Sequence, residues 1–205
     1  MKIAYVRVGL ILLAASTVLS GCLNLGDASK APAVVYYVLN DAGPAAPAAP
    51  VAPLPTPTLR VLDTTTGNFY DTDQLVFSRS PDTRGLYQFA RWTERPGKRF
   101  ADLMRARLDR QGGWNVSVGG YVHADWLLDT ELVEFYHDAV SEPGQVRLVL
   151  RADVVDIKQR KLLGHRVFEQ QVPLARYDAA AAAQASSLAV GHMLDDLSVW
   201  LASLK

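Results

Sequence analysis

The chain of 205 residues has a single cysteine, Cys22. A lone cysteine has no partner within its chain, so no internal disulfide can stabilise the fold and the hydrophobic core must do so alone. Histidine is also sparse, and the four histidines have no metal-ligand spacing with one another. They are His123, His137, His165 and His192. We therefore expect no metal site.

The chain has no excess charge of either sign, with 21 basic and 21 acidic residues. Removal of residues 1–21 would take away Lys2 and Arg7 and no acidic residue, leaving 19 basic against 21 acidic residues and a net charge of −2. Nucleic-acid binding typically needs a basic stripe, and binding to anionic lipid headgroups needs a polybasic patch. We expect neither kind of partner contact.

Motifs of catalysis are missing as well. The chain has no His-Glu-x-x-His pair, no glycine-rich phosphate loop and no Gly-x-Ser-x-Gly elbow. Asp153 and Asp156 lie three apart in a predicted strand, so their carboxylates point to opposite faces. Asp195 and Asp196 are adjacent on a predicted helix and do not face each other. We expect no catalytic residue, no cofactor and no enzyme activity.

The most informative segment that is present lies at the N-terminus. Lys2 and Arg7 precede an apolar run over residues 8–19, which is typical of a secretory signal and too short to span a bilayer comfortably. The run ends in Leu19-Ser20-Gly21-Cys22, which resembles the bacterial lipobox, where the cysteine is acylated and the chain is cut before it. The alternative is an ordinary signal peptide that happens to contain a cysteine. We predict a lipoprotein signal peptide at 1–21 and lipidation of Cys22.

Lipidation of Cys22 would determine where in the cell the mature chain is located. Two or more acyl chains hold a protein stably at a membrane surface, on the outer side of the cytoplasmic membrane or beyond it. Leu23 follows the cysteine. In enterobacterial lipoproteins an aspartate at this position usually means retention in the inner membrane. By analogy we expect this chain at the outer membrane, facing the periplasm.

Three regions follow the cysteine. Residues 22–33 are small and polar and are predicted to be a lipidated tether, whereas residues 34–205 are long enough for a single periplasmic domain with its own core. Within that domain, residues 43–57 are rich in proline and alanine, which favours an open polyproline II conformation. We interpret this segment as a solvated loop, with a recognition motif as the alternative.

The first half of the domain shows short strand patterns and one helix. β-Branched and aromatic residues predict strands over residues 34–39, 59–62, 74–78, 85–92 and 115–118. A helix begins near Pro96, which suits a first helical turn, and stops at Gly112-Gly113. Its apolar stripe includes Phe100, Met104 and Leu108.

The second half predicts three long strands and a final helix. Strands over 121–136, 146–156 and 164–174 are joined by short turns, which indicates an antiparallel meander. The helix runs from Asp178, a plausible N-cap, to Leu204. Its apolar seam favours packing on the sheet, with a partner helix or a membrane-lying helix as alternatives. The seam consists of Val190, Leu194, Leu197, Leu201 and Leu204.

These elements predict an α/β fold of the α+β kind. It has an antiparallel sheet of about five to six strands, a helix after the first strands and a long C-terminal helix packed on one face. The middle long strand alternates, so that Arg147, Arg151 and Asp153 share one face and leave it wet. Charge on such a face orients a docking protein more than it adds affinity. We take these three residues as a possible partner surface.

Four segments together resemble the ABC-type transport auxiliary lipoproteins of the paraquat-inducible-protein C type. The sequence Val35-Tyr36-Tyr37-Val38-Leu39 is similar to the family's Tyr-Tyr-Thr-Leu opening. Residues 89–96, Phe-Ala-Arg-Trp-Thr-Glu-Arg-Pro, are similar to its entry into the first helix. The helix at 100–108 and the strand at 124–135 resemble its next two segments, and a last helix ends both.

The resemblance implies a non-enzymatic role. Members accompany an ABC permease, its ATPase and a periplasmic protein of the mammalian-cell-entry type, and these move phospholipid or other hydrophobic molecules between membranes. The lipoprotein is then the outer-membrane-side partner of the periplasmic protein, and a homo-oligomer is possible. Two alternatives stay open: an outer-membrane assembly or structural lipoprotein that binds a β-barrel or the cell wall, and a periplasmic hydrolase with an unrecognised site.

We predict that Cys22→Ser releases the protein from membranes or leaves an uncut precursor, because serine offers no thiol for acylation. Membrane fractionation and the mass of the N-terminus check this. A Cys22→Ser chain that is processed and fractionates with the outer membrane as the unchanged chain does would refute the lipoprotein prediction.

Overall fold

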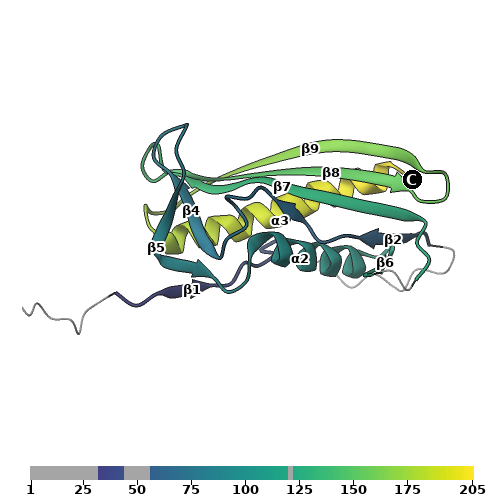
Figure 1. Cartoon of the computed structure of the whole chain (residues 1–205), viewed down its shortest axis with the longest axis horizontal. Coiled ribbons are helices and arrows are strands. Elements are labelled where there is room, and N and C mark those ends of the chain that lie inside the picture. The colour runs from purple at the N-terminus through teal and green to yellow at the C-terminus, as the bar shows by residue number, and fades with distance from the viewer. Residues whose placement is uncertain (1–31, 44–55, 120–121) are drawn as a thin grey trace, which may run out of the picture. The chain divides into compact units, whose positions relative to one another are not determined.

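The computed structural model describes residues 32–43, 56–119 and 122–205. The predicted signal peptide at 1–21, Cys22, nearly all of the tether and residues 44–55 of the predicted Pro/Ala-rich loop lie outside them. Residues Val34–Lys205 group into one compact unit (Figure 1). None of the helices in the described ranges combines the length and the apolar character needed to cross a membrane.

The sheet is built around one long strand, β7 (Trp126–Asp138). Along one edge, β7 pairs in antiparallel fashion with β8 (Gln145–Asp156), and β8 pairs in the same way with β9 (Lys161–Pro173). These three strands run side by side in Figure 1. The predicted meander is therefore confirmed.

Three short strands lie end to end along the other edge of β7, all parallel to it. They are β2 (Thr58–Val61), β3 (Thr65–Thr66) and β4 (Gln74–Ser78). Outside them, β2 pairs in parallel with β6 (Asn115–Ser117), and β4 pairs in antiparallel fashion with β5 (Gly85–Trp92). The strand β1 (Val35–Tyr37) is parallel to β5 and forms the edge of the sheet there.

The predicted sheet of five to six antiparallel strands is wrong in both number and direction. Within the described residues the sheet has nine strands with mixed pairing. Parallel neighbours need a long crossover, and here the chain passes through β5, α2 and β6 between β4 and β7. Local patterns reveal the turns between neighbouring strands, but they do not show which distant segments pair.

A β-bulge explains why neither face of β7 reads as uniformly apolar. The register with β8 shifts between Leu132 and Glu134. Before the bulge Leu128 and Leu132 are buried, and after it Phe135 and His137 are buried, so the buried positions change from even to odd. One extra residue on a strand moves every later side chain to the other face.

Both predicted helices form. The helix α2 (Pro96–Gln111) has Pro96 in its first turn and ends at Gly112, whose φ of 68° favours glycine. The helix α3 (Ala179–Ser203) is capped by Asp178, whose carboxylate accepts a hydrogen bond of 2.7 Å from the backbone N–H of Ala181.

The two helices bury one face of the sheet. α3 packs against β8 and β9, and α2 packs against β3, β6 and α3. Four of the five predicted seam residues of α3 are at most 1% exposed, and Leu204 is partly buried against the same core. The helix therefore packs on the sheet. The four are Val190, Leu194, Leu197 and Leu201.

A buried ion cluster holds the segment after β1 between the two helices. Arg107 of α2 donates to both carboxylate oxygens of Asp41, from Nε at 2.8 Å and from a terminal nitrogen at 2.5 Å. It also donates to Asp195 of α3. The hydrogen bond to Asp41 raises the pKa of Arg107. The backbone passes so close to α3 that a Cβ on Gly191 would lie 2.5 Å from the nitrogen of Gly43.

A second buried polar group lies where β7 runs beside β4, and Tyr87 of the next strand, β5, reaches it. His137 is 2% exposed, and its Nε2 lies 3.1 Å from the carbonyl of Pro143. A carbonyl only accepts, so Nε2 carries the hydrogen and Nδ1 accepts from the hydroxyl of Tyr87 at 2.8 Å. Burial lowers the pKa of His137, although Pro143 and Asp138 oppose the shift. Burial also raises the pKa of Tyr87 to about 12.

We predict that Asp41→Ala lowers the free energy of unfolding by about 3–5 kcal/mol, because it leaves the Arg107 guanidinium buried without its main partner. Asp195→Ala is the matched control and should cost about 1 kcal/mol or less, since its side chain is 41% exposed and water can replace it. Urea unfolding measures both. Equal losses would show that Asp41 is not the dominant partner.

We predict that acid destabilises the fold through His137. Because its pKa is lowered in the folded state, the unfolded chain binds the proton first, so stability falls as pH drops below about 6.5 and levels off below the folded pKa. His137→Gln should reduce the dependence of the free energy of unfolding on pH across this range. The half-exposed His165 gives the control variant His165→Gln. If the free energy of unfolding depends on pH equally in His137→Gln and in the unchanged chain, the prediction is wrong.

Candidate functional site

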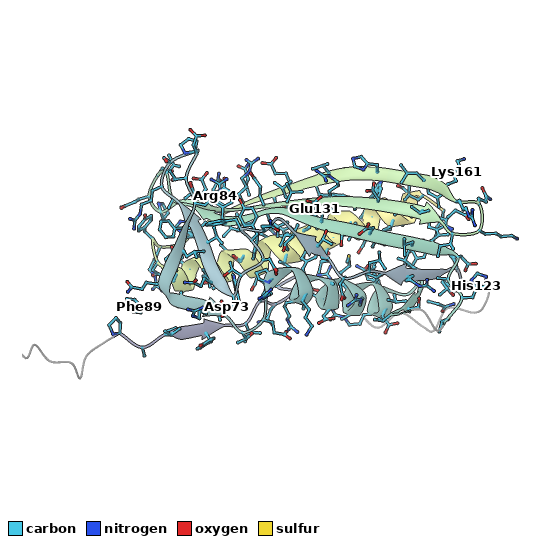
Figure 2. The ribbon with its side chains drawn as sticks, viewed as in Figure 1. Asp73, Arg84, Phe89, His123, Glu131 and Lys161 are labelled. Carbon is cyan, nitrogen blue, oxygen red and sulfur yellow. The ribbon has the colours of Figure 1, made fainter. Side chains whose placement is uncertain are left out.

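The face of β7, β8 and β9 opposite the helices carries rows of polar side chains. The register places Asp129 beside Asp153 and His165, and it places Glu131 beside Arg151. Figure 2 labels Glu131 on β7. We call the set the outward ladder, and it consists of Asp129, Glu131, Glu134, Arg147, Arg151, Asp153, His165 and Glu169.

Two rows of the outward ladder are closed by short contacts between strands. Arg151 lies 2.5 Å from Oε2 of Glu131, and Nδ1 of His165 lies 2.5 Å from Oδ1 of Asp153. All four side chains are between 37% and 50% exposed. These rows are therefore cross-strand pairs on a wet surface, where such pairs contribute up to about 1 kcal/mol each.

A third row is centred on Arg147. Its Nε lies 2.5 Å from Oε2 of Glu134 on β7, and a terminal nitrogen lies 2.8 Å from Oε1 of Glu169 on β9. The hydrogen bond to Glu134 is the main cause that raises the pKa of Arg147. Arg84, labelled in Figure 2, extends this row, because its guanidinium lies 3.9 Å from the ring centroid of Tyr136. Arg147 of β8 thus makes ion pairs with both neighbouring strands.

The outward ladder combines exposed ion pairs with a small polar hollow. A small polar hollow of about 110 Å³ lies over Asp129, Glu131, Arg151 and Asp153, with Thr65 and Thr130 at its side. Among the residues that the structure describes, no group of three or more His, Cys, Asp or Glu could hold a metal ion. Weak exposed pairs open at little cost, so a docking protein with complementary charge can compete for them.

The structure brings the predicted surface residues to one face but adds partners to each. Arg147, Arg151 and Asp153 all lie on β8 and point outward, as their alternation indicates. Their acidic and histidine partners come from β7 and β9 and were missed. The pattern of one strand could not show them, because the register places Arg147 opposite Tyr136 and only diagonal to Glu134. Cys22, the predicted lipid site, is outside the described residues.

The four histidines do not form a site. His137 is buried, and His165 pairs with Asp153 on the outward ladder. His123 and His192 are both exposed on separate elements. Figure 2 shows His123 at a loop, away from Glu131.

Solved structures share the fold. A Xanthomonas campestris protein assigned to family DUF330 is similar over 83% of this chain and 96% of its own, with a TM-score of 0.70 and 18% identity. An uncharacterised protein is similar over 82% of this chain and 99% of its own, with a TM-score of 0.66 and 14% identity. Identities this low show a common fold and nothing about activity.

No curated protein sequence matches the chain significantly. A family model, however, matches residues 37–198, which include every strand from β2 to β9 and most of α3. The model describes the ABC-type transport auxiliary lipoprotein component. Because the match covers well over half of the chain, the protein belongs to the ABC-type transport auxiliary lipoprotein family.

Proposed function

We propose that this protein is the outer-membrane-side auxiliary component of an ABC-type transport system of the mammalian-cell-entry type. Such a system moves phospholipid or other hydrophobic molecules between the two membranes. The family match over residues 37–198 carries this proposal. In it, the chain is lipidated at Cys22, faces the periplasm and acts without chemistry of its own.

The proposed task is docking to the periplasmic mammalian-cell-entry-type protein, through which the chain connects to the permease and its ATPase. The outward ladder is the surface that we assign to this contact. Its opposite face is buried under α2 and α3, whereas the ladder itself has no helix of the described residues packed on it. Arg147, Arg151 and Asp153 supply an ordered pattern of charge, which favours orientation and rapid encounter over raw affinity.

The ion pairs of the ladder allow a test that reverses charge without breaking the sheet. The double variant Glu131→Arg/Arg151→Glu keeps the pair between β7 and β8 but inverts its direction. Capture of the periplasmic partner should weaken about tenfold, mainly through slower association that depends on salt. Binding of the partner to the immobilised, folded chain measures this at low and high ionic strength.

A second exposed pair gives the matched control. Arg95 and Asp71 lie 2.8 Å apart off the ladder, with side chains 61% and 51% exposed. Asp71→Arg/Arg95→Asp should capture the partner as the unchanged chain does. Equal weakening by both double variants would remove the ladder from the contact. No capture by the unchanged chain would contradict the transport role itself.

A further inference from the structure

Exposed apolar side chains gather where the described chain begins. They come from β1, from the residues on either side of it and from β5 next to it. Their exposed fractions range from 39% to 59%. Figure 2 labels Phe89 at this end of the domain, and Figure 1 places β1 beside β5. We call the cluster the β1 rim, and it consists of Val34, Val35, Tyr36, Val38 and Phe89.

Most of the apolar side chains of the β1 rim lie on one face of the strand. β1 is an edge strand that pairs, among the described residues, with β5 alone, and the register places Val35 beside Ala90 and Tyr36 beside Arg91. Successive side chains of a strand point to opposite faces, so Val35 and Tyr36 extend on opposite sides, and both are exposed. By the same alternation the other three side chains of the rim lie on the face of Tyr36, and Val35 alone lies on the opposite face.

The rim is held in place by its own backbone neighbours. The carbonyl of Tyr37 accepts a hydrogen bond of 2.9 Å from the N–H of Thr93, and the carbonyl of Leu39 accepts one of 2.9 Å from Arg99. Two residues further on, Asp41 is bound by Arg107. The apolar side chains are thus presented on an ordered edge, which a frayed terminus would not provide.

The number of residues between Cys22 and the rim sets how far the rim can lie from the membrane. Eleven residues separate Cys22 from Val34. A coil of this length spans roughly 20 Å on average, and about 40 Å when fully extended. With Cys22 acylated, a segment of this length keeps the rim within reach of the bilayer surface.

The side chains of the rim and the short length of its strand suit a lipid interface. A fluid lipid interface closes around any apolar side chain that enters it, so the rim needs no partner surface of matching shape. The strand has three residues, which is too short an edge to template pairing with another chain. Tyrosine also suits the boundary between headgroups and acyl chains, because its ring is apolar and its hydroxyl is polar.

We infer that the β1 rim inserts into the interface of the membrane that carries the acyl anchor, so that the domain rests on that membrane at a defined orientation. The inference rests on the anchor at Cys22 that the proposed function includes. It adds a second, non-covalent contact of Tyr36, Val38 and Phe89 with lipid, at the depth of the headgroup and upper acyl region.

An introduced indole tests this contact. The acylated chain carrying Tyr36→Trp is placed in vesicles of phosphatidylethanolamine and phosphatidylglycerol, with and without brominated acyl chains. The indole at position 36 should emit at shorter wavelength and lose intensity when the chains are brominated. Val199→Trp is the control, since Val199 is 73% exposed on α3, away from the rim. Its emission should respond to bromine no more than that of the unchanged chain.

The possible results distinguish failure of rim insertion from failure of the acyl anchor or of the docking role. A chain that floats with the vesicles but shows no bromine quenching at position 36 overturns the inference alone. A blue shift without bromine quenching also overturns it, because protein then covers the rim. A chain that does not float overturns the anchor and the inference together, and partner capture still tests the docking role. Phe89→Trp repeats the measurement at a second rim position, and thermal unfolding checks that each variant is folded.

Discussion

The contact between Arg107 and Asp41 is the interaction on which the domain most depends. It joins α2 to the segment that follows β1, and through Asp195 it also joins α3. Both Arg107 and Asp41 have side chains less than 10% exposed, and a buried charge of this kind is tolerated only when its hydrogen bonds are satisfied. The cluster therefore determines where the N-terminal segment enters the fold, and it positions β1 at the edge of the sheet.

The two faces of the sheet serve different purposes. One face packs on α2 and α3 and forms the core, and the other carries the outward ladder. β7 contributes to both faces along its whole length. The bulge shifts its alternation by one residue, so that the apolar side chains after the bulge still point into the core. A domain built this way presents an ordered pattern of charge on one face, and the β1 rim lies where the described chain begins.

Much of the local structure could be predicted. The strands Gln74–Ser78 and Gly85–Trp92 have the predicted limits, and Pro96, Gly112 and Asp178 bound the helices as expected. These features depend on residues close in sequence: β-branched composition, fixed proline geometry, glycine at positive φ and a side-chain cap. The outward orientation of Arg147, Arg151 and Asp153 followed for the same reason, since it needs only the alternation of one strand.

What the sequence determined by itself was therefore most of the elements, without the two-residue strand β3, together with the apolar seam of α3 and the lipobox-like segment ending in Cys22. Only the tertiary structure decided that β2, β3 and β4 align in parallel along one edge of β7. It also decided that Asp41 meets Arg107, 66 positions away, and that Arg107 meets Asp195, 88 positions away. Such contacts leave no local pattern, because each depends on where the whole core places two segments that have no sequence relation to each other.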